Sequence, residues 1–250
     1  MNRNAAILQG WQTATTILSL ISKRCRVVPV VALLAIAPAI AQNSEMQEKL
    51  AAVKAVAAEN KQQLRQYQWT ETIQLTLKGD PKPPTSSLCQ YGSDGQVQKT
   101  PIGAPPPEPS GGRLKQKIIA KKKAEIKGYM EQVKALLSIY VPPDPQRMQE
   151  AYQAGKFSLN PMPGVLRLVF TDYAQPGDRM SIAFDTTAKK ITLLDVDTYL
   201  DEEKHAVTLH VQMATLPNGP NYAQKTVLNA SAKELVVTTT NYSYQKLGGQ

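Results

Sequence analysis

The stretch Tyr67-Gln-Trp69-Thr-Glu71-Thr-Ile73-Gln-Leu75-Thr-Leu77 decides the fold, because apolar and polar side chains alternate along it. Every odd position except Glu71 is apolar or aromatic, and every even position is polar. Successive side chains of a strand point to opposite faces, so this pattern predicts a strand with one face on a core and the other in water. Gly79-Asp80-Pro81 then ends the strand.

Strand patterns recur downstream as far as Tyr244. We expect short strands at 86–91 and 96–99, and longer ones at 165–173, 179–185, 190–200, 205–215, 222–229 and 234–244. Turn signals such as Gln175-Pro176-Gly177 separate the longer strands, and no helical pattern lies between them. Strands this close in sequence join as hairpins. The predicted fold class is therefore α+β, with an antiparallel β meander and no doubly wound parallel sheet.

Three helices are expected around these strands. Ser44 and Gln47 form a capping box before an amphipathic helix at 45–66. The Pro/Gly-rich segment 101–112 reads as a linker. Beyond it, apolar residues from Leu114 to Tyr140 fall on one arc, which predicts a helix with a broad buried stripe. A further helix has Asp144 as its N-cap and ends before Gly155.

The N-terminus has the parts of a secretory signal peptide. A fifteen-residue apolar run, Val27 to Ala41, follows Lys23, Arg24 and Arg26, and it ends in small residues. The run is short for a membrane span, which takes about 20 apolar residues. We therefore expect residues 1–41 to be a signal peptide cleaved near Ala41, and 42–250 to be a single domain in the periplasm or outside the cell. Cys89 is then the one remaining cysteine, so the mature chain has no intramolecular disulfide.

Charge is concentrated in one segment. Four of the basic residues behind the formal net charge of +9 lie in the predicted signal peptide, which leaves +5 for the mature chain. Between Arg113 and Lys134, eight basic residues stand against Glu125 and Glu131, so this segment alone carries +6. The basic character is thus a local patch.

The order of elements resembles a known family. A helix, a few strands, a helical insert and a long meander behind a signal peptide resemble the LolA-like periplasmic carriers of lipoproteins and lipids, over roughly residues 44–247. The stretch Ala214-Thr-Leu-Pro217-Asn218-Gly219-Pro-Asn221-Tyr222, continuing to Asn241-Tyr-Ser-Tyr-Gln-Lys-Leu247, is similar to uncharacterised exported bacterial proteins with that fold. The resemblance implies an incomplete (open) β-barrel with helices packed on its concave side. It carries over no functional residue.

The sequence contains no recognisable catalytic motif. His205 and His210, if both lie on one strand, point to opposite faces, so a shared metal site is not expected. Cys89 has no paired base, and no nucleophile, phosphate-loop or zinc motif occurs. Asp195 and Asp197 share a strand face, but a solvated or lysine-paired face is the preferred interpretation over acid–base chemistry. We predict no catalytic residue, no metal and no cofactor, and hence no enzyme.

The preferred function is binding of an apolar or amphiphilic ligand, such as a lipid or a lipoprotein acyl chain, by an exported cell-envelope protein. Predicted apolar lining residues are Trp69, Ile73, Leu75, Leu77, Leu168, Phe170, Ile182, Phe184, Leu209 and Val211. Glu71 lies on the same strand face and could meet a ligand headgroup or lie at the solvent-exposed end of the strand.

The predicted contacts to an anionic membrane are Lys117, Lys121, Lys123, Lys127 and Lys134. A purely solvated helix face would also explain this clustering of lysines. The alternative is a structural or interaction protein of the envelope that uses the basic helix 113–134 as a contact surface. Nucleic acid is not an expected partner, and the oligomeric state is left open.

Overall fold

The computed structural model describes residues 55, 58–103, 112–217 and 219–248. All of them belong to one compact unit, Asn43–Gln250. The predicted signal peptide lies outside the described residues, as does most of the predicted helix 45–66. Of that helix, the described segment 58–64 is helical, and it leads directly into the first strand as expected.

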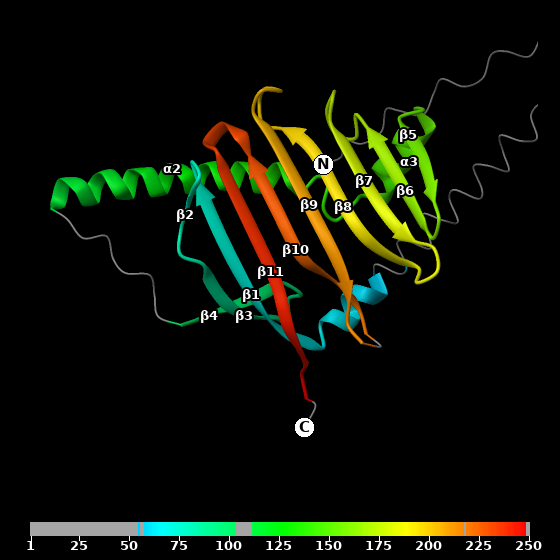
Figure 1. Cartoon of the computed structure of the whole chain (residues 1–250), viewed down its shortest axis with the longest axis horizontal. Helices are drawn as coiled ribbons and strands as arrows, with labels where there is room; N and C mark the ends of the chain where they lie inside the picture. The colour runs from blue at the N-terminus through cyan, green and yellow to red at the C-terminus, as the bar shows by residue number, and fades with distance from the viewer. Residues whose placement is uncertain (1–54, 56–57, 104–111, 218, 249–250) are drawn as a thin grey trace, which may run out of the picture. The chain divides into compact units, whose positions relative to one another are not determined.

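Eleven strands within the described ranges form one sheet that does not close (Figure 1). They are β1 (Tyr67–Leu77), β2 (Asp80–Pro81), β3 (Thr85–Tyr91), β4 (Val97–Ile102), β5 (Phe157–Met162), β6 (Val165–Thr171), β7 (Arg179–Asp185), β8 (Lys190–Tyr199), β9 (Ala206–Thr215), β10 (Asn221–Ala230) and β11 (Leu235–Lys246). The order is β4-β3-β1-β11-β10-β9-β8-β7-β6-β5, and β2 pairs with β1. The α+β fold with an open antiparallel meander is therefore confirmed.

Strand β1 has the bounds that the alternating pattern predicts, and it joins the short strands β3 and β4 to the last strand of the meander. It pairs antiparallel with β3 on one side and with the last strand, β11, on the other. Leu75 lies opposite Val237, and Leu77 lies opposite Leu235, a buried core residue. One face of β1 thus meets the core.

The two faces of β1 give a direct test of this register. We expect Leu75→Asp to lower the free energy of unfolding by about 2–4 kcal/mol, because it places a carboxylate without a partner against the core. Thr76→Asp adds the same charge on the opposite face and should cost less than about 1 kcal/mol. Urea denaturation of the two variants measures the difference. Equal losses would contradict the assignment of the faces.

Both edges of the sheet differ from the sequence expectation. The predicted strand 96–99 extends through Pro101 to Ile102, into the predicted linker, and β5 was not predicted at all. Proline lacks the N–H that a central strand needs, so Pro101 and Pro161 argued against strands there. The structure accommodates both because β4 and β5 are the edge strands of the described sheet, where the lost donor is not needed.

Two longer helices follow the first four strands. Helix α2 (Arg113–Leu137) runs across one face of the sheet, and α3 (Pro145–Gln153) begins at the Asp144 N-cap, whose carboxylate accepts a bond from the Gln146 amide (Figure 1). Neither helix, nor the described part of the first, is long and apolar enough to cross a membrane.

The core lies between this pair of helices and the sheet. Its buried members come from α2, the following turn, α3 and strands β6 to β11, among them Val133, Tyr140, Met148, Phe170 and Val196. The predicted buried stripe of α2 is confirmed for its second half and is wrong for its first. Leu114 and Ile118 are 75% and 50% exposed, because the helix extends beyond the core that covers Tyr129 and Val133.

Candidate functional site

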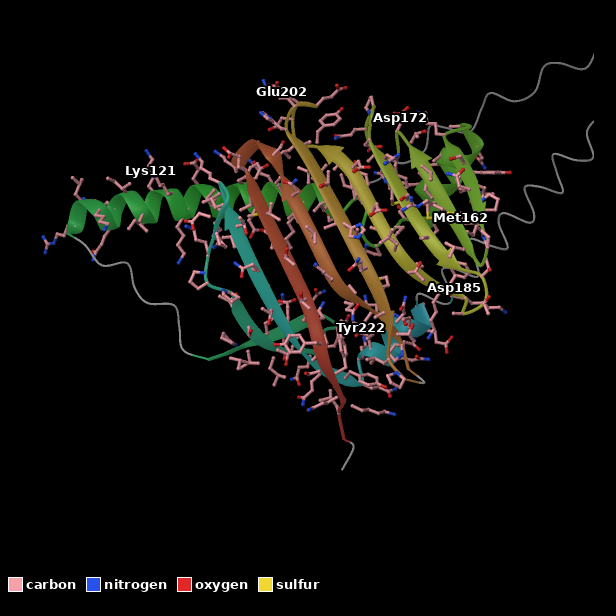
Figure 2. The ribbon with its side chains drawn as sticks, in the orientation of Figure 1. Lys121, Met162, Asp172, Asp185, Glu202 and Tyr222 are labelled. Atoms are coloured by element: carbon pink, nitrogen blue, oxygen red, sulfur yellow. The ribbon has the colours of Figure 1, made fainter. Side chains whose placement is uncertain are left out.

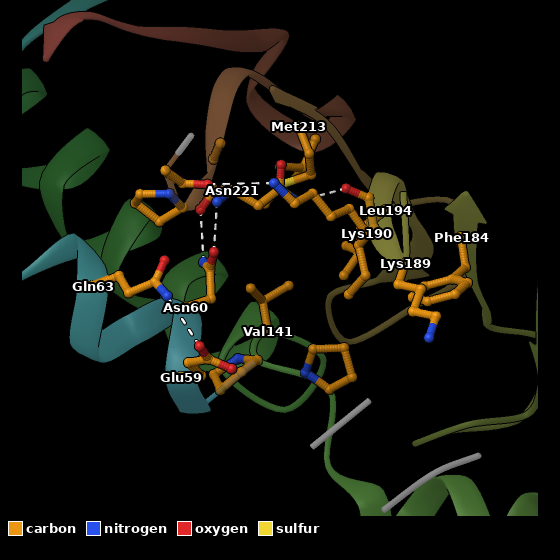
Figure 3. A pocket seen from close by; sticks show the side chains of 17 residues that line it. Glu59, Asn60, Gln63, Val141, Phe184, Lys189, Lys190, Leu194, Met213 and Asn221 are labelled. Carbon is orange, nitrogen blue, oxygen red and sulfur yellow. Dashed lines mark hydrogen bonds between the residues drawn. The ribbon is translucent and has the colours of Figure 1, made fainter. Parts of the chain in front are cut away.

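A pocket of about 520 Å³ lies between the helical segment 58–64, the segment 141–143 and the strands β7 to β10 (Figure 3). Its apolar wall consists of Val141, Pro142, Pro143, Phe184, Ile191, Leu194, Val211, Met213 and Ala223. Pockets of about 300–1,000 Å³ with mainly apolar walls are typical of small-molecule sites. This pocket is therefore the candidate binding site.

Most polar side chains of the pocket lie on or near segment 58–64, whereas Lys189 lies beside Phe184 on the other side (Figure 3). The polar side chains are those of Glu59, Asn60, Gln63, Lys189, Lys190 and Asn221. Gln63 donates to Glu59 at 3.1 Å, and the Lys190 ammonium donates to the Gly219 carbonyl at 3.3 Å. Apolar wall and polar side chains together suit a ligand that has both an apolar part and a polar part.

Two hydrogen bonds fasten segment 58–64 over the sheet. The Asn60 amide donates to the Asn221 carbonyl oxygen at 2.6 Å, and its own oxygen accepts from the Asn221 backbone N–H at 2.5 Å (Figure 3). The Asn221 side chain in turn donates to the Ile191 carbonyl at 2.6 Å. The first residue of β10 is thus held on both sides, and it fixes one border of the pocket.

A buried carboxylate anchors the opposite wall. Tyr140 directly precedes the segment 141–143, and its hydroxyl donates to Asp178 at 2.5 Å and contacts the Thr198 hydroxyl at 2.8 Å. Asp178, 2% exposed, also accepts backbone N–H bonds from Tyr173 (2.5 Å), Ala174 (2.9 Å) and Gln175 (2.9 Å). Burial and the Asp178 carboxylate raise the pKa of the Tyr140 hydroxyl, so it remains a hydrogen-bond donor.

The predicted lining residues are divided between the pocket and the core. Phe184 and Val211 line the pocket. Leu75 and Leu77 pack against the core. Four other predicted residues are buried in it: Leu168, Phe170, Ile182 and Leu209. Ile73 is half-buried in β1. The remaining predicted residue, Trp69, belongs to an aromatic cluster.

That aromatic cluster shares strand β10 with the pocket. Trp69 stacks on Tyr244 with ring centroids 5.5 Å apart, and Tyr222 lies 4.3 Å from Tyr244. Tyr222 stands between the pocket residues Asn221 and Ala223 in β10. The Trp69 indole N–H donates to Asn241 at 3.1 Å, so the cluster is held by a polar bond as well as by ring contacts.

Glu71, the exception in the β1 pattern, forms an ion pair with Lys99. Its carboxylate lies 2.5 Å from the lysine ammonium and is 11% exposed. Cys89, on the neighbouring strand β3, is fully buried, and burial followed by the Glu71 charge raises the pKa of its thiol. A thiol with a raised pKa is a poor nucleophile.

Asp195 is the centre of a second, polar hollow of about 580 Å³ on strands β5 to β9. It contacts His210 at 2.5 Å, Arg167 at 3.1 Å and Ser181 at 3.3 Å. Asp197 pairs with Arg179 at 3.0 Å, so arginine and histidine take the place of the lysine partners expected from the sequence. The Ser181 hydroxyl donates its hydrogen bond to the Asp195 carboxylate. A serine nucleophile would instead be hydrogen-bonded to the histidine that takes its proton. His205 lies just before β9, and within the described ranges no group of three or more His, Cys, Asp or Glu could hold a metal ion.

The five predicted membrane-contact lysines of α2 are all exposed. Figure 2 shows Lys121 directed away from the helix axis. Near the middle of α2, Glu125 accepts a bond from Lys233 at 2.6 Å, which ties the helix to the turn between β10 and β11. The exposed lysines are therefore carried on a helix that is fixed to the sheet.

Comparison with known proteins finds similarity only between this chain and solved structures. No family model matches the chain, and neither does a curated protein. A DUF1329 family protein from Desulfovibrio piger is similar with a TM-score of 0.38 and 9% identity, over 80% of this chain and 94% of that one. A domain assigned to outer membrane lipoprotein sorting from Vibrio parahaemolyticus has a TM-score of 0.34 and 11% identity, over the same shares, 80% and 94%. Both similarities concern the fold alone.

Proposed function

We propose that this chain is an exported, non-catalytic binding protein of the cell envelope that carries an apolar or amphiphilic ligand. The observation that supports the proposal is the pocket of about 520 Å³ between segment 58–64 and the sheet. Its apolar wall and the polar groups beside segment 58–64 match a single acyl chain with a polar head. The predicted signal peptide supports the same location for the protein.

Binding in such a pocket follows from burial of apolar surface. Each Å² of apolar area removed from water contributes about 25 cal/mol, and no directional bond is needed for the chain itself. A polar head would lie beside Asn60, Asn221 and Lys190. Because residues 58–64 are held to β10 by the two Asn60 bonds, release of those bonds would open the pocket and admit the ligand.

Probe binding tests the proposal. We expect the folded unit Asn43–Gln250 to bind a fluorescent fatty acid at a stoichiometry near one, with unchanged near-ultraviolet circular dichroism. An unlabelled fatty acid should displace the probe, since both occupy the same pocket. Native mass spectrometry of the purified protein measures any lipid that it retains. A folded protein that binds neither probe nor lipid contradicts the carrier proposal.

The second candidate is an interaction protein that contacts its partner through the basic helix. The exposed first half of α2 is the specific observation in its favour.

A further inference from the structure

The first half of α2, residues 113–124, extends past the core with almost all of its side chains in water. Eleven of these twelve residues are exposed, and Ile119 is half-buried. Six of the twelve are basic and none is acidic. We call this segment the exposed half of α2. At about 1.5 Å per residue it is about 18 Å long.

Apolar side chains in the exposed half have no core to cover. Leu114 is 75% exposed and Ile118 is 50% exposed, whereas Tyr129 and Val133 of the second half are buried. The same helix is thus a core element at one end and an amphipathic surface element at the other. Leucine and isoleucine side chains left in water contribute no burial energy, so a helix end that is only solvated has no need of them.

We propose that the exposed half of α2 docks on an anionic lipid bilayer, lying in the plane of the interface. Helices that bind in this way combine Lys/Arg with Leu or Ile and lack the length of apolar sequence needed to span. Each Lys or Arg near an anionic surface strengthens binding about fivefold, so the six cations add to what Leu114 and Ile118 provide by inserting into the bilayer. Lys115 and Lys122 fall on the apolar arc, and their long stems allow the ammonium groups to reach the headgroups.

The pattern favours a bilayer over other acidic partners. A polyanion such as nucleic acid would use the charges but leave Leu114 and Ile118 in water, and no aromatic residue occurs in 113–124 to stack on bases. A bilayer uses both kinds of side chain at once. Lys127 and Lys134, which the sequence also placed in the contact, are exposed but lie in the second half of α2, whose Tyr129 and Val133 pack into the core. We therefore exclude Lys127 and Lys134 from the docking surface.

Vesicle binding by the unit Asn43–Gln250, which lacks the apolar run 27–41, tests the docking. We expect binding to vesicles of phosphatidylglycerol and phosphatidylcholine in equal parts, and at least tenfold weaker binding to pure phosphatidylcholine. The double variant Lys117→Gln/Lys121→Gln should bind roughly thirtyfold more weakly. The matched control Lys225→Gln/Lys246→Gln removes the same charge from exposed strand positions and should bind within about twofold of wild type, because these lysines lie outside the surface. Equal weakening by both pairs would overturn the proposal in favour of a net-charge effect.

A fluorescence readout tests the position of the helix directly. Trp69, the one tryptophan of this unit, is 6% exposed, so a new tryptophan at Leu114 reports its own surroundings. We expect Leu114→Trp emission to shift to shorter wavelength with anionic vesicles and to be quenched by brominated lipid, whereas Leu159→Trp on β5 should show neither change. Absence of the shift at position 114, or an equal shift at 159, would overturn the docking. Fatty-acid binding without vesicles is measured on the same variants, so failure of the docking and failure of the carrier function are seen separately.

Discussion

Asp178→Ala is expected to lower the free energy of unfolding by about 3–5 kcal/mol, a large fraction of the stability of an ordinary domain. The substitution removes the buried acceptor of the Tyr140 hydroxyl and of three backbone N–H groups, and it leaves Tyr140 only its contact with Thr198. Each buried donor that loses its partner costs about 1–3 kcal/mol. Urea denaturation followed by circular dichroism measures the loss.

Asp197→Ala is the matched control for this prediction. Asp197 is also a paired aspartate, but its side chain is 49% exposed, and its ion pair with Arg179 should contribute less than about 1 kcal/mol. Similar losses in the two variants would show that Asp178 does not anchor the pocket wall. Because Tyr140 directly precedes the pocket wall 141–143, we also expect Asp178→Ala to weaken ligand binding at temperatures where the protein is still folded.

Ala223→Trp is expected to reduce fatty-acid binding at least tenfold while leaving the domain folded. Ala223 lines the pocket, and its small side chain leaves space that an indole ring would fill. Filling an empty cavity costs little strain compared with overpacking a filled core, so the unfolding temperature should change by only a few degrees. Fluorescence titration with the labelled fatty acid measures the affinity.

Gln224→Trp provides the control at the neighbouring position. Gln224 is exposed and is the extra residue at the irregularity where β10 pairs with β9, so its side chain is not part of the pocket. We expect this variant to bind the probe like wild type. Unchanged binding in Ala223→Trp would place the ligand elsewhere, and the pocket would lose its proposed role.

The sequence predicted those elements whose pattern is local. The alternation along 67–77 gave the bounds of β1, and Asp144 with Pro145 marked the start of α3, because side-chain period and capping chemistry depend on nearby residues alone. The strands with proline, β2, β4 and β5, were shortened or missed, since only the sheet order reveals that each has a single partner strand. The apolar arc of α2 gave no sign of where the core ends, so the exposure of Leu114 was not foreseen.

The candidate site was predictable only in part. Period two placed apolar residues on the helix-covered face of the sheet, but it could not separate core from pocket, and of the ten predicted residues Phe184 and Val211 line the pocket. Asn60 lies 161 positions from Asn221 in sequence, and Asp178 lies 38 positions from Tyr140. Such distant polar pairs leave no periodic signal, so the borders of the pocket became visible only in the folded chain.

Pro101 and Pro161, one in each edge strand, limit self-association of this protein through the edges of its sheet. Proteins with closed barrels escape self-association because they have no edge, whereas this sheet keeps two. A proline ring interrupts the row of donors that a neighbouring copy would need to extend the sheet from molecule to molecule. The chain can thus leave its sheet unclosed and still resist growth into fibres.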